Sequence, residues 1–405
     1  MSTYLFILSL LFVNFWGLKP FGTISQDMNI ILIMAMLLYG YCKYANTRKA
    51  IRIRGRYKYL LWIVVGILIS TIPTMIYYNQ DITTSLIVYR SQITLLTIPV
   101  LFRIHPSIEE ISKALFWFAI AMFVANLIVG INPGLFVFSE EVIMRYELDP
   151  ENNRLRAISG VSLVIIPLYY YLQKLRTNFN RKLLFKVFFI FLVIYIAENR
   201  STLFPATILT LYSFTEIKSK YKPIILTVLA IVIAIVAFQT IETWESLILE
   251  TEENINDEDA NRNKALLYFT TIGQPSWITC LFGNGIISAQ ASNYTILLKE
   301  NGIFYSDVGF VGYWYNFGII PIIAILVLFI NILKSKIQTY SIKLMTIHIL
   351  ICAFTISYFF NYKGPILQLI FAYYIYYCNI ESTLYKKTRN DYYNNYQLQE
   401  RATHN

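Results

Sequence analysis

The feature that most constrains this chain is a succession of apolar stretches divided by short polar connections. The hydrocarbon core of a bilayer is about 30 Å thick, and a helix needs about 20 apolar residues to cross it. Glu198-Asn199-Arg200 alone divides the seventh and eighth stretches, which are short. We predict an all-α fold, a polytopic transmembrane helical bundle of about twelve spans. The stretches lie near residues 3–18, 28–46, 59–78, 84–102, 111–131, 157–173, 184–197, 201–215, 223–239, 307–333, 342–361 and 364–380.

The composition also indicates a surface that faces lipid. Charged residues make up 14% of the chain, whereas soluble proteins carry about 25%. The net charge of +10 does not indicate nucleic-acid binding, because the basic residues form short clusters between apolar stretches, as juxtamembrane anchors do. Three of the four cysteines fall within apolar stretches, which excludes a disulfide framework. The first stretch lacks a basic n-region and a small-residue cleavage site, so we expect it to remain as a span.

The basic clusters predict which connections face the cytoplasm. The densest cluster lies between residues 48 and 58, and we place it inside. The same orientation puts the basic connections at 103, 174–182, 218–222 and 334–343 inside, together with both termini. It puts the acidic residues between 140 and 151, and the acidic segment after residue 240, outside. The expected location is therefore a cell membrane, crossed many times.

Two of the predicted outer loops are large, and they divide the chain. They cover residues 132–156 and 240–305, and the second contains nine acidic and three basic residues. Apolar spacing in its segments 241–248 and 265–271 predicts short helices packed on the outer face. In the predicted organisation, spans one to nine occupy residues 1–239 and the large extracytoplasmic loop occupies residues 240–305. Spans ten to twelve then occupy residues 306–380, and a cytoplasmic tail covers residues 381–405.

Common catalytic motifs are missing from the sequence. It has no HExxH, Walker loop, GxSxG or CxxC pair, and its three histidines, His105, His348 and His404, all fall away from the predicted outer face. An outward metal site would therefore lack histidine ligands. We look instead to charged residues in or beside the spans, because such charges are costly and usually functional.

Three outward arginines are candidates for binding an anion. Arg90 lies about two turns inside the fourth stretch, where it has a function or extends outward to a polar partner. Arg154 and Arg156 precede the sixth stretch on the outer side, against the positive-inside trend. Either an anionic ligand or the acidic residues between 147 and 151 would explain their clustering.

Three further residues lie close to expected helix starts. Arg200 opens the eighth stretch, where a guanidinium beside a helix N-terminus can clamp a phosphate, although a pair with Glu198 is the alternative. Arg262 follows the acidic strip of the long loop and by itself suggests a solvated face. Asp307 opens the tenth stretch, where it is either an N-cap or a shielded general base.

The order of these elements resembles the O-antigen polymerase and O-antigen ligase-like superfamily of bacterial membrane glycosyltransferases. The resemblance covers roughly residues 150–325, together with the number of spans and the long late outer loop. Its pieces are Arg154-Leu155-Arg156-Ala157-Ile158-Ser159-Gly160, Glu198-Asn199-Arg200-Ser201, Asn261-Arg262, and Phe282-Gly283-Asn284-Gly285 followed by Ser306-Asp307 and Phe317-Gly318.

The resemblance implies roles for the candidate residues. Arg200 and Arg262 would hold the diphosphate of a lipid-linked donor, with Arg90, Arg154 and Arg156 in support. Ligases of the family place a histidine near the end of the long loop, and this sequence has none there. Asp307 is the nearest titratable residue, so it becomes the expected base, and a polymerase is favoured over a ligase.

The expected function is polymerisation of undecaprenyl-diphosphate-linked oligosaccharide repeat units into a surface polysaccharide, such as O-antigen, capsule or exopolysaccharide. No cofactor or metal is expected, because arginines can neutralise the leaving diphosphate. Expected partners are the lipid-linked oligosaccharide, membrane lipids and a chain-length regulator. The main alternative is a flippase or other transporter of lipid-linked oligosaccharides, which should show two related halves and short loops. A third is a polyprenyl-sugar glycosyltransferase with an acidic motif in its first outer loop, where this chain offers only Asp27.

Overall fold

The computed structural model confirms the all-α prediction for the part of the chain that it describes. That part comprises residues 1–19, 21, 26–44, 58–89, 97–104, 106–137, 160–197, 200–217, 261–274, 276–288, 303, 305–334 and 340–353. Within these ranges all regular elements are helical, and extended backbone pairs only at an isolated bridge between Leu18 and Phe136. The expected stretches 223–239 and 364–380 lie outside the described residues.

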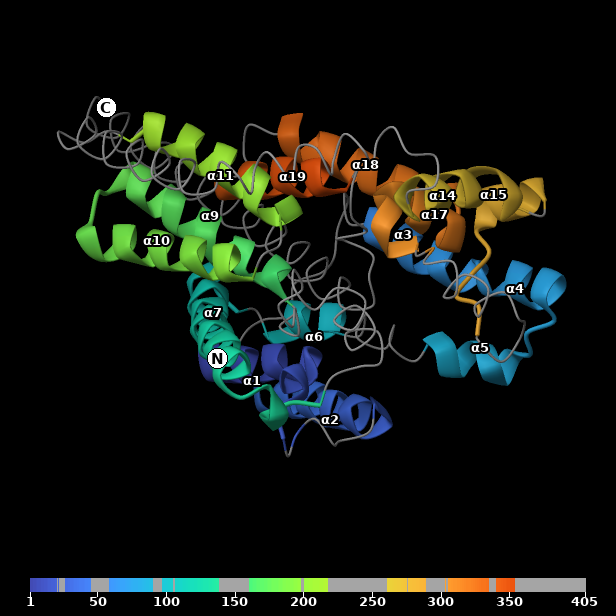
Figure 1. Cartoon of the computed structure of the whole chain (residues 1–405), viewed down its shortest axis with the longest axis horizontal. Helices are drawn as coiled ribbons and strands as arrows, with labels where there is room; N and C mark the ends of the chain where they lie inside the picture. Colours follow the sequence, from blue (N-terminus) through green and yellow to red (C-terminus); the bar gives the residue numbers. More distant parts are fainter. Residues whose placement is uncertain are drawn as a thin grey trace, which may run out of the picture.

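Most described helices coincide with the apolar stretches expected from the sequence (Figure 1). The long outer loop also contains helices, as its spacing predicts for 265–271. The elements are α1 (Ser2–Phe12), η1 (Asn14–Gly17), α2 (Gln26–Tyr44), α3 (Lys58–Ile69), α4 (Thr71–Tyr78), α5 (Ile82–Val88), α6 (Thr97–Ile104), α7 (Ile108–Ile131), η4 (Pro133–Leu135), α9 (Val161–Thr177), α10 (Arg181–Ile196), α11 (Arg200–Thr215), α14 (Asn261–Leu267), η5 (Tyr268–Ile272), α15 (Trp277–Phe282), η6 (Tyr305–Val308), α17 (Gly309–Phe317), α18 (Ile319–Lys334) and α19 (Tyr340–Cys352).

One described helix meets both the length and the hydropathy expected of a membrane span. This is α7, with 24 residues and a mean hydropathy of 2.3 in its most apolar window. Its N-terminus carries a capping box, in which the Ser107 hydroxyl and the Glu110 carboxylate each accept a backbone N–H of the other residue. Other apolar helices of the described part, including α1, α18 and α19, are shorter.

The stretch 307–333, expected as one span, is instead divided into η6, α17 and α18. The break falls at Gly318, whose φ of +77° is favourable for glycine but strained for a residue that has a Cβ atom. Pro321 follows, and its ring would clash with the carbonyl of residue 317 in a continuous helix. Glycine and proline together therefore end α17 at Phe317 and start α18 at Ile319.

Three other expected stretches also differ from single helices. The stretch 59–78 is divided into α3 and α4 near Ser70, because Pro73 cannot donate a hydrogen bond to the turn before it. The stretch 84–102 contains α5 and α6, with residues 90–96 outside the described part. The stretch 3–18 is helical only to Phe12, because Asn14–Trp16 take left-handed φ values that end α1.

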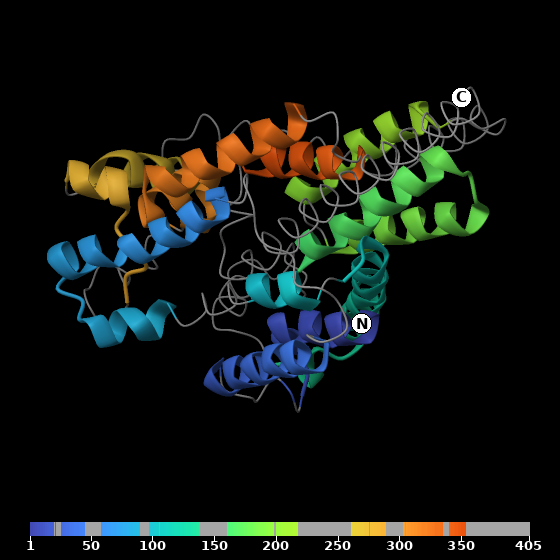
Figure 2. The same ribbon diagram turned by 180° about the vertical axis from the view of Figure 1, so that it is seen from behind.

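The helices pack in three groups, joined by two long elements (Figure 1). Helices α1, α2, α6 and α7 form the first group, and α9, α10, α11 and α19 form the second. Helices α3, α4, α14, α15 and α17 form the third, with α5 beside α4. Helix α7 packs on both α1 and α9, while α18 packs on both α3 and α19. Figure 2 shows the same arrangement from behind, with α18 running along the molecule from the third group to the second.

Candidate functional site

The sequence-predicted site residues fall in different parts of the structure. Arg90, Arg154 and Arg156 lie outside the described residues. Arg200 is the first residue of α11, in the second group of helices. Arg262 is the second residue of α14, and Asp307 is the third residue of η6. For these last three the structure describes the helical backbone alone.

The structure brings the elements that contain Arg262 and Asp307 together. Helix α14 packs on η6, and η6 packs on α17. Ala265, Phe269, Val308 and Tyr315 from these elements and η5 form a buried apolar cluster of their own. Arg262 precedes Ala265 by three residues, which is nearly one helical turn, and Asp307 directly precedes Val308. Two chain positions 45 residues apart are thus attached to one small core, to which none of the described side chains of α11 contributes.

A second buried junction lies beside this cluster, where Gly283-Asn284-Gly285 passes between α4 and α17. Both glycines have positive φ, +83° and +71°. A Cβ atom at residue 283 would overlap the Asn316 carbonyl, and one at residue 285 would overlap the Thr74 hydroxyl. The close approach of backbone to its neighbours therefore requires glycine at both positions.

Asn284 lies at the centre of this junction and is fully buried. Its side-chain amide donates to Oε1 of Gln274 and to the carbonyl oxygen of Tyr315, each at 3.2 Å. Its Oδ1 accepts a hydrogen bond of 3.1 Å from the Tyr78 hydroxyl, and its backbone carbonyl accepts one of 2.7 Å from the Thr74 hydroxyl. One buried amide thus connects α4, the end of η5 and α17, with donors and acceptors matched.

The segment after Gly285 is fixed to residues at the two ends of α5, Gln80 before it and Tyr89 after it. The backbone N–H of Ile286 donates to the Tyr89 hydroxyl at 3.1 Å, and that of Ser288 donates to Oε1 of Gln80 at 2.8 Å. The Tyr89 hydroxyl is also 2.8 Å from the Ser70 hydroxyl. Since Tyr89 directly precedes Arg90, the peptide leading to that arginine is attached to the same junction.

Asp81 is a titratable group at the edge of this junction. It is the N-cap of α5, and the backbone N–H of Thr84 donates to its Oδ1 at 2.9 Å. Hydrogen bonds from the Thr84 side chain and backbone hold the pKa of Asp81 below its ordinary value. Asp81 is therefore ionised at neutral pH, which suits a capping role and leaves it a weak proton acceptor.

Of four aromatic residues near the junction that could stack on sugars, three have other contacts or are buried. Tyr313 and Tyr315 are buried, and Trp314 donates from Nε1 to the Cys280 carbonyl at 2.7 Å. Trp277 is 70% exposed and remains open to a ligand. No cluster of three histidine, cysteine or acidic side chains that could hold a metal occurs among the residues that the structure describes.

The sequence analysis identified Gly283-Asn284-Gly285 but missed the residues that bind this segment. These are Thr74, Tyr78, Gln80 and Tyr89. A signal was available, because Thr74 and Tyr78 are polar residues four positions apart in an apolar stretch and so share one helix face.

Comparison with known proteins gives no family for this chain. It matches no protein-family model. A search of curated proteins likewise finds none that is similar.

Proposed function

We propose that this chain is a multi-pass membrane protein with both termini in the cytoplasm, and that it polymerises lipid-linked oligosaccharide repeat units on the outer face of a bacterial membrane. The membrane placement is supported by apolar side chains exposed on several helices. Leu38, Leu68 and Phe185 are 65%, 61% and 68% exposed. Water would disfavour so many large apolar side chains over neighbouring helices, whereas acyl chains would cover them.

The alternation of spans in this proposal is supported on one side of the bundle by contacts between predicted outer connections. The N–H of Lys19, in the first outer connection, donates to the Leu135 carbonyl, in the third, at 2.9 Å. The Gln80 side chain, in the second outer connection, bonds Ser288 in the long loop. Four outer connections therefore meet in pairs.

Contacts between predicted inner connections support the same alternation on the opposite side. The Nε of Arg176 is 3.1 Å from a Glu216 carboxylate oxygen, and its guanidinium lies over the Tyr340 ring at 4.4 Å. These three residues belong to or adjoin three different connections that the basic clusters place inside. A bundle with twelve alternating spans would produce this segregation of contacts, because each connection can reach only others on its own side.

The polymerase proposal rests chiefly on the packing of α14 against η6, beside the buried Gly283-Asn284-Gly285 segment. This packing attaches the backbone of a cation, Arg262, and of a carboxylate, Asp307, to one rigid support. A glycosyl transfer with a diphosphate leaving group needs such a combination, because charge develops on the phosphates while the acceptor loses a proton.

In the proposed reaction the acceptor hydroxyl oxygen of one repeat unit attacks the anomeric carbon of the growing chain. The bond between that carbon and the diphosphate oxygen breaks, and its electron pair leaves with the diphosphate. Arg262 and Arg200 stabilise the leaving charge, supported by Arg90, Arg154 and Arg156, and Asp307 takes the proton of the acceptor. Bidentate guanidinium contacts suit a diphosphate better than lysine would.

Substitution of the two principal arginines tests this clamp. Arg200→Ala and Arg262→Ala should each reduce polymer synthesis by about 10²–10³-fold, the usual cost of losing one donor to a developing oxyanion. Lysine replacements should restore little, and Lys264→Ala in the same helix α14 is the matched control that should retain activity. Normal polysaccharide ladders on a gel from both alanine variants would refute the proposed diphosphate clamp.

Labelling of single cysteines from either side of the membrane tests the orientation separately. Positions 52 and 178 and the tail should react only from the cytoplasmic side, and position 255 only from outside. Cytoplasmic labelling at 255 would reverse the orientation and remove the proposed outer site.

A further inference from the structure

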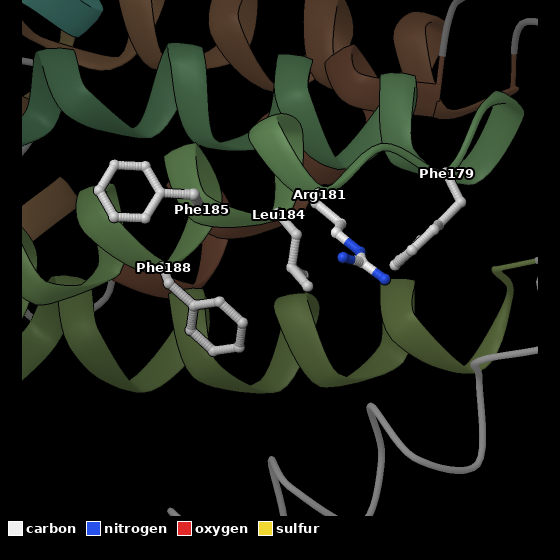
Figure 3. Close-up of a pocket in the computed structure, with 5 residues that line it drawn as sticks. All are labelled: Phe179, Arg181, Leu184, Phe185 and Phe188. Carbon is white, nitrogen blue, oxygen red and sulfur yellow. The ribbon is translucent and has the colours of Figure 1, made fainter.

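An open groove of about 390 Å³ lies along the start of α10, far from the proposed reaction site. It is lined by Phe179, Arg181, Leu184, Phe185 and Phe188 (Figure 3). This volume is in the range of about 300–1,000 Å³ typical of small-molecule sites. The lining combines four apolar side chains with a single cation at one end.

The apolar part of the groove is held in place by ring contacts. Phe188 stacks on Phe214 of α11, with ring centroids 6.3 Å apart, and Phe185 stacks on Phe189, with centroids 6.4 Å apart. Phe185 is nevertheless 68% exposed. Two neighbouring aromatic rings therefore form a fixed apolar shelf that the described protein leaves uncovered.

The cationic end of the groove is positioned by the start of α10. Asn180 is the N-cap, and its Oδ1 accepts from the Lys182 backbone N–H at 2.8 Å. This cap places Arg181 and Lys182, both exposed, in the first turn. Figure 3 shows the Arg181 guanidinium between Phe179 and Leu184. Among the described residues no carboxylate pairs with Arg181, in contrast to Arg176, which is paired with Glu216.

We propose that this groove binds an anionic glycerophospholipid, with its phosphate at Arg181 and an acyl chain along Leu184, Phe185 and Phe188. The charges complement each other, since the Arg181 guanidinium lies in the groove at the positive N-terminal end of α10. A free phosphate would leave the aromatic shelf in water, whereas a lipid covers both parts. The site relies on the membrane placement proposed above, which puts the start of α10 at the cytoplasmic leaflet, but not on polymerase activity.

Native mass spectrometry of the full-length protein in detergent tests the site, with dioleoyl phosphatidylglycerol and dioleoyl phosphatidylcholine as probes. The intact protein should bind the anionic lipid more tightly than the zwitterionic one. Arg181→Gln should weaken phosphatidylglycerol binding about tenfold or more, the effect of losing one charge-assisted hydrogen bond. Phe185→Ala should weaken the binding of both lipids, because it removes part of the apolar shelf.

The matched control is Lys334→Gln, which removes an exposed cation at the end of another apolar helix, α18, away from the groove. It should leave phosphatidylglycerol binding within about twofold, a shift well under 1 kcal/mol. Equal weakening by Arg181→Gln and Lys334→Gln would overturn the proposal in favour of diffuse attraction. Complete competition by inorganic phosphate, or dimers that exclude lipid from the groove, would overturn it as well. None of these readouts measures sugar transfer, so failure here leaves the proposed function untouched.

Discussion

The buried Asn284 junction allows a quantitative prediction about local stability. Asn284→Leu keeps the number and branching of the side-chain heavy atoms but removes three side-chain hydrogen bonds, to Gln274, Tyr315 and Tyr78. At about 1 kcal/mol each, the loss is about 3 kcal/mol. A change of 1.4 kcal/mol is a factor of ten, so the equilibrium constant for local opening should rise about 10²-fold.

Hydrogen exchange measured on peptides is the direct assay. In the intact protein the backbone N–H groups of Asn284, Gly285, Ile286 and Ser288 all donate to other parts of the junction. Asn284→Leu should therefore speed exchange of the 283–288 peptide about 10²-fold, while the 111–131 peptide of α7 stays unchanged.

The control for this prediction is Asn126→Leu. Among the described residues, Asn126 donates only to the Met122 carbonyl within α7, at 3.0 Å, so its loss should leave the 283–288 peptide as slow as in the intact protein. Unchanged exchange of that peptide in Asn284→Leu would refute the reasoning, because the junction would then not depend on its central amide.

Three further predictions follow from particular contacts. Gly285→Ala should lower the free energy of unfolding by more than about 1 kcal/mol, because the φ of residue 285 is +71° and the added methyl group overlaps Thr74. Gly130→Ala in α7 places its methyl group in open space and should be neutral or stabilising in thermal melts. Glu216→Gln should cost no more than about 1 kcal/mol, because the side chains of the Arg176–Glu216 pair are 41% and 27% exposed and water screens it; a larger loss in the same melts would contradict this. The lowered pKa of Asp81 means that its charge stabilises the fold fully above the ordinary pKa of 3.8 and loses this effect as the pH falls through the lower folded-state pKa. The difference in melting temperature between the intact protein and Asp81→Ala should therefore be smaller in acid than at neutral pH. The difference in melting temperature between Asp81→Asn and Asp81→Ala should change little with pH, because asparagine still caps the helix but carries no charge.

Apolar patterning was sufficient to locate most helices of the described part. Long runs such as 111–131 and 28–46 correspond to α7 and α2 within a few residues, because burial of apolar side chains favours a helix wherever the backbone can form one. The breaks were harder to predict. Gly318 and Pro321 were visible in the sequence, but the surrounding run is so apolar that hydropathy alone suggested one continuous span.

The junction around Asn284 could not be predicted from local sequence. Several of its hydrogen bonds join residues more than 200 positions apart, such as Thr74 and Asn284 or Tyr78 and Asn284. No periodicity within one segment contains that information. In the sequence, Gly283 and Gly285 were noted only as part of a resemblance to a glycine-containing segment, which does not indicate the helix that lies against them. The adjacency of α14 and η6 likewise depends on the long-range cluster of Ala265 and Val308.

Polymerase activity can be measured with purified protein in liposomes, supplied with a lipid-linked repeat unit and no other enzyme. The intact protein should lengthen the lipid-linked chains, and Asp307→Asn, which keeps size and capping ability, should lower the rate about 10²–10⁴-fold. Full lengthening by Asp307→Asn would remove Asp307 as the base. Translocation of the repeat unit without any lengthening by the intact protein would contradict the polymerase and indicate a transporter instead.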